Sequence, residues 1–301
     1  MNAQCGDARH MERALELALR GLLSADPNPR VGCVIARGGR VLAEGWHERA
    51  GGPHAEAMAL ASLGGAARGA TAYVTLEPCC HVGRTPPCAD ALVAAGVVRV
   101  VYAVRDPNPR VNGGGAARLA AAGIEVTGGV LEAEARALNA GFLSRFERGR
   151  PWVRVLLGAP RGGDPGGDAV QRLRARASAI LTGVGTVLAD DPRLEVGLRD
   201  ATRHPLRVVL DTRLRTPATA RVLAPPGRAL VLTASGDPAR RAELERAGAS
   251  IVHVAAGRDG LDLAAVLRRL AEIEVNELQV EAGATLTRAL LAAGLADECV
   301  S

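Results

Sequence analysis

The chain has 301 residues, of which 48% are apolar and only 2% aromatic. This length is enough for two domains with separate cores, and Ala, Val and Leu must supply most of the buried surface. No apolar run approaches the roughly eighteen residues of a membrane span, and the N-terminus has no apolar signal-peptide region. We therefore expect a cytoplasmic protein with no membrane partner.

The net charge of +5 is carried by arginine alone, because the chain contains no lysine. Arginine suits bidentate recognition of phosphate, but no basic run alternates with aromatic residues, as single-strand nucleic-acid binding requires. We expect a phosphorylated small molecule as the partner and no nucleic acid. The oligomeric state is left open, a homo-oligomer included.

The six cysteines lack the spacing of a disulfide framework, which indicates a reducing compartment. Three of them fall in one short motif described below. The other three, Cys5, Cys33 and Cys299, are interpreted as small buried apolar residues.

The first half of the chain mixes helical and strand patterns. The first two strands, separated by Arg37-Gly38-Gly39-Arg40, form a β-hairpin. The predicted helices are Glu12–Leu23, Glu56–Leu63, Cys88–Ala95, Ala116–Ala122 and Leu131–Phe146. The predicted strands are Val31–Ile35, Val41–Trp46, Thr71–Leu76, Val97–Val104 and Ile124–Val126.

A domain boundary is predicted at Arg148-Gly149-Arg150-Pro151, giving domains 1–148 and 151–301. Beyond it strands and helices alternate, which predicts a mostly parallel sheet covered by helices. The predicted strands are Trp152–Leu157, Ala179–Thr182, Leu206–Leu210, Ala229–Leu232, Ser250–Val254 and Glu277–Val280. The predicted helices are Asp168–Ala177, Pro238–Ala247, Leu261–Ala271 and Ala284–Ala293.

A metal motif lies in the first domain. It consists of Pro53-His54-Ala55-Glu56, then Glu77-Pro78-Cys79-Cys80-His81, closed by Cys88. His54, Cys79 and Cys88 would give zinc three ligands and leave one position for water. Glu56 would then be free to move protons, as in the zinc deaminases of nucleobases. A closed structural site with Cys80 or His81 as fourth ligand is the alternative, although adjacent side chains such as Cys79 and Cys80 rarely reach one ion.

The segment from Glu77 to Cys88 resembles the deaminase half of the bifunctional riboflavin-biosynthesis enzymes, whose motif reads HAE and then EPCxHxGRTPPC. The resemblance extends from Pro27-Asn28-Pro29 to Asp106-Pro107-Asn108-Pro109. It implies a cytidine-deaminase-like three-layer domain that binds Zn²⁺, with Asn28 and Arg84 at the substrate. The hexapeptide Asp-Pro-Asn-Pro-Arg-Val occurs at Asp26 and again at Asp106, and the second copy is interpreted as a turn.

The second domain resembles the reductase half of the same family in Ala179–Pro192 and Val280–Leu286. By itself Gly183-Val184-Gly185-Thr186 is a weak dinucleotide signal, because position 188 is leucine. The resemblance implies a dihydrofolate-reductase-like α/β domain that uses NADPH. The cofactor contacts it implies are Ala159, Thr186, Asp190, Thr212 and Gly283. The substrate contacts it implies are Arg174, Leu194 and Glu281.

The second domain also departs from the family pattern in three ways. Leu156 stands where the family has a lysine, and about a dozen residues after Ala159 are replaced by a Gly- and Pro-rich stretch. The sequence ends at Ser301, where the family continues into further strands, so an exposed sheet edge is expected. We therefore expect a shortened, truncated reductase half with poor activity.

These features predict hydrolytic deamination of 2,5-diamino-6-(5-phosphoribosylamino)pyrimidin-4-one, with Glu56 as proton carrier. In the family, NADPH-dependent reduction of the ribose to ribitol follows. A cytidine- or tRNA-type deaminase is one alternative. Two features disfavour it: the long insert between the two cysteines, and the presence of the second domain. A zinc-stabilised nucleotide-binding protein without turnover is another, and the intact Glu56 disfavours it.

Overall fold

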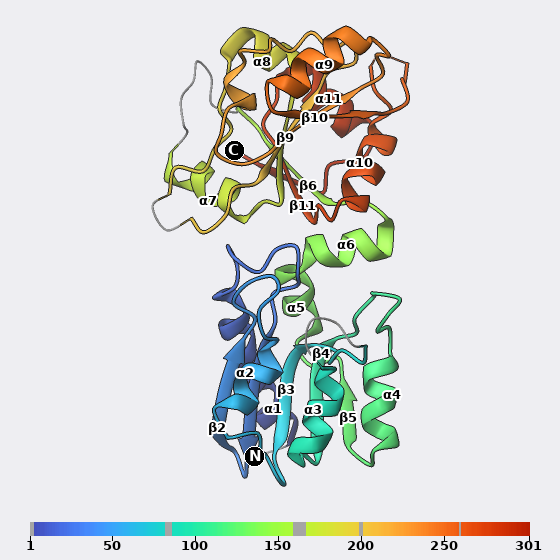
Figure 1. Ribbon diagram of the computed structural model, residues 1–301. Coiled ribbons are helices and arrows are strands. Elements are labelled where there is room, and N and C mark those ends of the chain that lie inside the picture. The colour runs from blue at the N-terminus through green and yellow to red at the C-terminus, as the bar shows by residue number, and fades with distance from the viewer. Residues whose placement is uncertain (1–2, 82–85, 159–166, 199–200, 259) are drawn as a thin grey trace. The chain divides into compact units, whose positions relative to one another are not determined.

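The structure is a computed structural model that describes residues 3–81, 86–158, 167–198, 201–258 and 260–301 (Figure 1). Ala159 and Arg84, two of the expected site residues, lie outside these ranges. The chain divides into two compact units, Met1–Glu147 and Arg148–Ser301. Among the described residues, no helix is both long and apolar enough to cross a membrane.

The first unit is built on a five-stranded sheet with the order β2-β1-β3-β4-β5. The hairpin strand β1 pairs antiparallel with both β2 and β3, whereas β3, β4 and β5 run parallel. The strands are β1 (Gly32–Arg37), β2 (Arg40–Trp46), β3 (Thr71–Leu76), β4 (Arg99–Val104) and β5 (Glu125–Gly128). The helices are α1 (Ala3–Leu19), α2 (Ala55–Ala61), α3 (Cys88–Ala95), α4 (Gly114–Ala121), α5 (Glu132–Leu138) and α6 (Ala140–Arg148).

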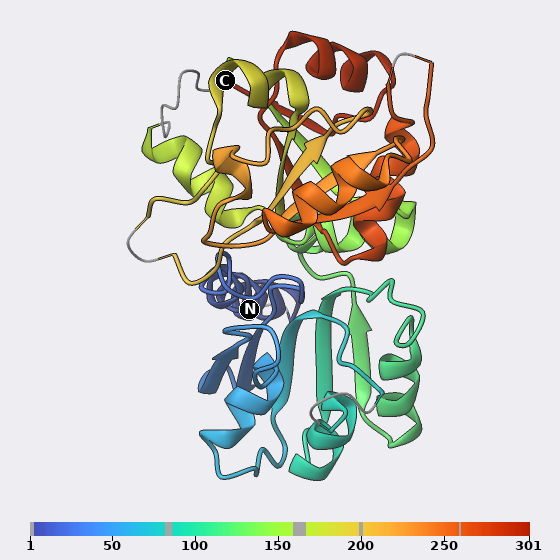
Figure 2. The ribbon, with the colours of Figure 1, turned by 45° about the horizontal axis from the view of Figure 1, so that its top comes forward.

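Helices cover both faces of this sheet, so the unit has three layers (Figures 1 and 2). Leu60 of α2, Leu92 of α3 and Leu119 of α4 share one apolar cluster with the sheet. Met11 of α1 and Phe142 of α6 belong to the cluster on the opposite face. Alternating strand residues supply the two clusters, as the pleat of a sheet buried on both sides requires.

The helix expected over Leu131–Phe146 is interrupted at Asn139, and this expectation was therefore wrong. The Asn139 side chain accepts a hydrogen bond from the backbone N–H of Arg30 and donates one to the Arg30 carbonyl, at 2.8 and 2.9 Å. Asparagine side chains that satisfy backbone groups compete with helix geometry. Here the partner lies 109 residues away in sequence, so no local pattern announces the break.

The second unit is built on a seven-stranded sheet with the order β10-β9-β8-β7-β11-β6-β12, parallel throughout. The strands are β6 (Trp152–Leu156), β7 (Ala179–Gly183), β8 (Leu206–Leu210), β9 (Ala229–Thr233), β10 (Ala249–His253), β11 (Glu277–Val280) and β12 (Glu298–Val300). The helices are α7 (Asp168–Arg176), α8 (Val184–Asp190), α9 (Pro238–Arg246), α10 (Leu263–Glu272) and α11 (Ala284–Ala292), with a 3₁₀ turn at Arg221–Leu223.

Apolar clusters lie on both faces of this sheet. Leu267 of α10 and Leu290 of α11 pack on one face, and Val187 of α8 and Leu244 of α9 pack on the other. The predicted, mostly parallel sheet covered by helices is thus present, and the helices lie on both of its faces. Two elements were not predicted, α8 and β12. Cys299 on β12 is exposed, so its interpretation as a buried residue was wrong, whereas Cys33 is buried as expected.

Candidate functional site

The three expected metal ligands come from the ends of three elements. His54 is the N-cap residue of α2, and Cys88 is the first residue of α3. Cys79 follows β3 by two intervening residues. The approach of α2 to the sheet depends on Gly45, because a Cβ there would lie 2.3 Å from the Ala55 carbonyl oxygen. A glycine on β2 therefore lets the helix that carries His54 reach its position.

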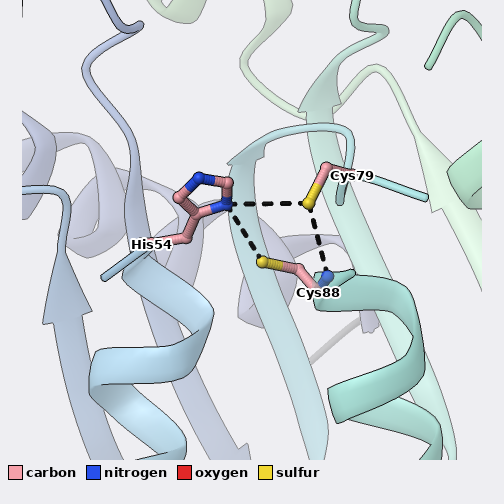
Figure 3. A group of neighbouring side chains, drawn as sticks. All are labelled: His54, Cys79 and Cys88. Atoms are coloured by element: carbon pink, nitrogen blue, oxygen red, sulfur yellow. Dashed lines mark hydrogen bonds between the residues drawn. The ribbon is translucent and has the colours of Figure 1, made fainter. Parts of the chain in front are cut away.

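The ligand atoms converge in one small cluster (Figure 3). The Nδ1 atom of His54 lies 3.3 Å from Sγ of Cys88 and 3.6 Å from Sγ of Cys79. All three ligand atoms lie within 4.8 Å of one another. Ligands bound tetrahedrally to one zinc ion are roughly 3.5–3.8 Å apart. The donor set and its spacing therefore fit a zinc ion.

Without metal, the two thiols share their protons unequally. A hydrogen bond from Cys88 lowers the pKa of the Cys79 thiol to about 4, and the backbone N–H of Cys88 donates to the same sulfur at 3.3 Å. The pKa of Cys88 is raised, because its thiol proton is held by Cys79 and its surroundings are buried. A hydrogen bond with Cys79 raises the pKa of His54. The cluster thus already stabilises one thiolate.

Glu56 is the second residue of α2, in the first turn of the helix. Its side chain is only 4% exposed, and burial raises the pKa of its carboxyl group. It also interacts with the Cys88 thiol, which places a carboxyl group beside the ligand cluster. A buried carboxyl with a raised pKa is suited to exchange protons near neutral pH.

Cys80 and His81 do not join the cluster in the described structure. The Cys80 thiol points instead to the carbonyl oxygen of Arg110, at 3.5 Å. Among the described residues, only His54, Cys79 and Cys88 form a group able to hold a metal. The arrangement is therefore that of an open three-ligand site, which is typical of catalytic zinc.

Asn28, an expected substrate contact, is linked to the metal motif through His47. The Asn28 side-chain amide donates to Nε2 of His47 at 3.0 Å, and Nδ1 of His47 donates to the carbonyl of Pro53 at 2.9 Å. The rings of His47 and His54 lie 5.6 Å apart. Burial lowers the pKa of His47, so a neutral ring with one donor and one acceptor matches this chain of bonds.

Two further residues support the site and were missed in the sequence. Glu77 accepts backbone hydrogen bonds from Gly113 and Ala116, each at 3.0 Å, and so fixes the start of α4 against the end of β3. Gly115 lies so close that a Cβ there would be 1.9 Å from the Pro78 carbonyl oxygen. The one signal in the sequence for this supporting role was the position of Glu77 at the start of the cysteine motif.

In the second unit three of the expected cofactor residues, Thr186, Thr212 and Gly283, follow the carboxyl ends of β7, β8 and β11. Oγ1 of Thr186, in the first turn of α8, accepts a hydrogen bond from the backbone N–H of Gly283 at 3.2 Å. Gly283 is the N-cap residue of α11. Asp190 ends α8, and Thr212 lines a pocket beyond β8.

At the carboxyl ends of β7 and β11, the strand connections change direction. From β7 the chain proceeds to β8, β9 and β10 on one side, and it returns to β11 on the other. Open α/β sheets bind ligands at such a switch point. The ends of β7 and β11 are therefore the expected place for a dinucleotide.

The three expected substrate residues of this unit have different environments. Arg174 and Glu281 form a buried bidentate ion pair at 2.7 and 2.8 Å, with side chains 4% and 3% exposed. Leu194 packs its side chain into the apolar cluster that also contains Val209 and Leu214. The structure thus brings Arg174 and Glu281 together at the end of β11 and places Leu194 in the core.

The first unit is an α/β domain with an open zinc-type site, and the second is a parallel α/β domain with a topological switch point between β7 and β11. Two family descriptions agree with this division. The cytidine and deoxycytidylate deaminase zinc-binding region matches residues 6–104, and the RibD C-terminal domain matches residues 159–300.

Full-length relatives show the same combination. The riboflavin biosynthesis protein RibD of Escherichia coli is 44% identical, over 98% of this chain and 86% of its own length. RibD of Aquifex aeolicus is 37% identical, over 98% of this chain and 85% of its own length. The structure of Acinetobacter baumannii RibD superposes with a TM-score of 0.89 at 42% identity, covering 98% of this chain and 86% of that one. A Thermotoga maritima diaminohydroxyphosphoribosylaminopyrimidine deaminase/5-amino-6-(5-phosphoribosylamino)uracil reductase superposes with a TM-score of 0.82 at 34% identity, with coverages of 98% and 86%.

The chain belongs to the RibD family of riboflavin-biosynthesis enzymes. The expected fold class, a cytidine-deaminase-like domain followed by the reductase domain of this family, is confirmed. The expected cofactors are confirmed in the same way, zinc for the deaminase region with its His/Cys/Cys cluster and NADPH for the reductase domain.

Proposed function

We propose that residues 1–148 catalyse the hydrolytic deamination of 2,5-diamino-6-(5-phosphoribosylamino)pyrimidin-4-one. The observation that carries this proposal is the convergence of His54, Cys79 and Cys88 with Glu56 buried beside them. The name of the Thermotoga maritima relative supports the choice of substrate. The second expected activity, reduction of the ribose to ribitol, is assigned to residues 151–301.

When bound by His54, Cys79 and Cys88, zinc would lower the pKa of a coordinated water towards neutrality. The Glu56 carboxylate takes a proton from the attacking water and passes it to a ring nitrogen of the pyrimidine. It later delivers a proton to the departing amine. A carbon–oxygen bond forms and a carbon–nitrogen bond breaks, so water is consumed, ammonia is released and no redox step is involved.

Substrate binding in this domain is assigned to Asn28 and Arg84. The hydrogen bonds through His47 support Asn28, because they hold its amide in one orientation next to the segment that carries His54. The excess of arginine supports a phosphorylated pyrimidine as substrate. We propose a cytoplasmic enzyme, either a single chain or a homo-oligomer, that has neither a nucleic-acid nor a membrane partner.

The reductase domain would hold NADPH at the ends of β7 and β11. The proposed contacts to the cofactor are Ala159, Thr186, Asp190, Thr212 and Gly283, and those to the sugar are Arg174, Leu194 and Glu281. The hydrogen bond between Gly283 and Thr186 supports this placement, because it lies at the start of α11. The start of an α-helix offers backbone N–H groups to a pyrophosphate. NADPH supplies the hydride, and this chain's residues orient the sugar towards it.

The deaminase proposal is tested with Glu56→Gln. The amide keeps the shape of the carboxyl but cannot carry protons, so ammonia release should fall by roughly 10²–10⁴-fold while zinc is retained. The matched control is Glu48→Gln, an exposed glutamate six residues before His54, which should be unaffected. Unimpaired ammonia release by Glu56→Gln would rule out the proton carrier. Equal or faster turnover of cytidine would point to the cytidine-deaminase class instead.

A further inference from the structure

The segment that carries Asn28 is held by a residue at the break between α5 and α6. The Asn139 side chain accepts a hydrogen bond from the backbone N–H of Arg30 at 2.8 Å and donates one to the Arg30 carbonyl at 2.9 Å. One amide thus satisfies both backbone groups of Arg30, as the facing residue of an antiparallel strand would. Asn139 and Arg30 are 3% and 5% exposed, so these hydrogen bonds lie in a low-dielectric interior, where they are strong.

Asn139 is itself fixed by the two helices that it joins. Its backbone N–H donates to the Ala135 carbonyl of α5 at 3.2 Å, and its carbonyl accepts from the Leu143 N–H of α6 at 3.0 Å. The guanidinium of Arg30 adds a second connection, because it donates to the Leu138 carbonyl at 3.0 Å. The position of Arg30 is therefore set by helices that lie more than a hundred residues further along the chain.

The position of Arg30 in turn fixes that of Asn28. Pro29 lies between them, and a proline restricts both its own φ and the backbone of the residue before it. The same short segment contacts His47 twice: the Asn28 amide donates to the His47 ring at 3.0 Å, and the Val31 carbonyl accepts from the His47 backbone N–H at 2.9 Å. Asn28 is half-buried whereas Arg30 is buried, so Asn28 keeps a surface that a ligand can reach.

We propose that Asn139 is a positioning residue of the deaminase site, which sets the place of the Asn28 amide through the main chain of Arg30. This inference rests on the proposed function, in which Asn28 contacts the pyrimidine. Hydrogen bonds weaken steeply with distance and angle, so an amide that must meet the edge of a ring tolerates little displacement. Without Asn139 the N–H and carbonyl of Arg30 would be buried and unpaired, and the segment would have to move to find other partners.

The test is the rate of ammonia release from 2,5-diamino-6-(5-phosphoribosylamino)pyrimidin-4-one by the unaltered protein, Asn28→Ala, Asn139→Ala and the double variant. Asn139→Ala should raise KM by about 10-fold and change kcat by less than about threefold, because a substrate contact is misplaced while Glu56 is untouched. The double variant should be no worse than Asn28→Ala alone, since Asn139 acts through Asn28. Zinc content should equal that of the unaltered protein.

Two further variants separate positioning from a general loss of stability. Asp7→Asn is the matched control, because Asp7 is also buried and hydrogen-bonded. Its partner Arg99 is the first residue of β4, whereas Cys79 follows the carboxyl end of the parallel neighbour β3. This variant should lower the melting temperature and leave KM unchanged.

Arg30→Met is the second variant and keeps the proposal testable if Asn139→Ala does not fold. It removes the guanidinium bonds to the carbonyls of Leu138 and Leu22 but retains the backbone bonds to Asn139. Because one of the two connections remains, KM should rise by a smaller factor than in Asn139→Ala, again with little change in kcat.

Three results would overturn the proposal. The first is an unchanged KM in Asn28→Ala, and the second is an unchanged KM in both Asn139→Ala and Arg30→Met. The third is a double variant whose loss is the product of the two single losses, which would give Asn139 a general structural role. In all three cases the deaminase assignment survives, since the unaltered protein still releases ammonia. No ammonia release by the unaltered protein would instead overturn that assignment together with this inference.

Discussion

Three carboxylates of the first unit lie in different environments and have different roles. Glu56 is buried beside the thiols, Glu77 accepts backbone N–H groups, and Asp7 forms an ion pair with Arg99. The first is placed for proton transfer and the second for holding a loop. The third stabilises the fold, because two N–H groups of Arg99 donate to its oxygens at 2.7 and 2.9 Å and the Tyr73 hydroxyl donates at 3.0 Å.

The Asp7 ion pair should make the stability of the first unit depend on pH. The hydrogen bonds from Arg99 hold the pKa of Asp7 below its ordinary value of 3.8. A lowered pKa means that the stabilisation is present above about pH 4 and is lost as the pH falls through the folded-state pKa. At pH 7 we expect Asp7→Asn to lose about 1–3 kcal/mol of unfolding free energy, and the difference from the unaltered protein should shrink as the pH falls below the ordinary pKa of the carboxyl group.

Urea unfolding followed by Trp46 fluorescence, in a Trp152→Phe background, reports on the first unit alone. The control is Glu125→Gln, which removes the other carboxylate paired with Arg99; its side chain is 69% exposed, so little change is expected. A loss in Asp7→Asn that stays constant from pH 7 down to the acid limit of the folded protein would contradict the ionic account.

At the scale of elements, the zinc site depends on how closely α2 and α4 approach their neighbours. Gly45 admits α2 to the sheet, and Gly115 admits α4 to the carbonyl of Pro78, next to Cys79. Neither glycine belongs to the metal motif. The sequence predicted the ligands and Glu56 because these residues form short motifs with a recognisable spacing. It missed these contacts because the close approach of two backbones leaves no local pattern in the sequence.

We therefore predict that Gly115→Ala damages the metal site without touching a ligand. Its Cβ would need to occupy space 1.9 Å from the Pro78 oxygen, so the backbone that carries Cys79 must move. Retention of zinc against a chelator should weaken by about 10- to 100-fold, as for other supporting residues of metal sites. Gly6→Ala in α1, where a Cβ meets nothing within 4 Å, is the matched control. Equal zinc retention by the two variants would show that this contact is unimportant.

At the scale of the whole molecule, alternating patterns predicted both sheets but not their strand orders. The switch point depends on the position of β11 between β7 and β6. The pairing of β11 with β6 joins segments that lie more than a hundred residues apart in the sequence. Short elements were also missed. The three residues of β12 gain their place only by pairing with β6, and α8 begins with Val184-Gly185-Thr186, which are weak helix formers.

The two activities should differ in rate. Leu156, where the resemblance described above implies a lysine, is a buried apolar residue on β6, next to β11. The resemblance also implies that about a dozen residues of the family pattern are missing after Ala159, in a stretch that lies outside the described residues. Because a misplacement of about 1 Å can cost roughly 100-fold in rate, we expect NADPH oxidation far slower than ammonia release. The comparison uses the deaminated product as substrate, and similar rates for the two steps would contradict this expectation.

The most direct test of the account is the zinc content of purified protein, measured by elemental analysis. The geometry of His54, Cys79 and Cys88 predicts about one zinc per chain. Cys88→Ser should lose most of it, because serine is a poor substitute for a thiolate ligand. Cys80→Ser should retain it, since Cys80 points to the Arg110 carbonyl and not to the cluster. Full zinc occupancy in both Cys79→Ser and Cys88→Ser would contradict the central claim.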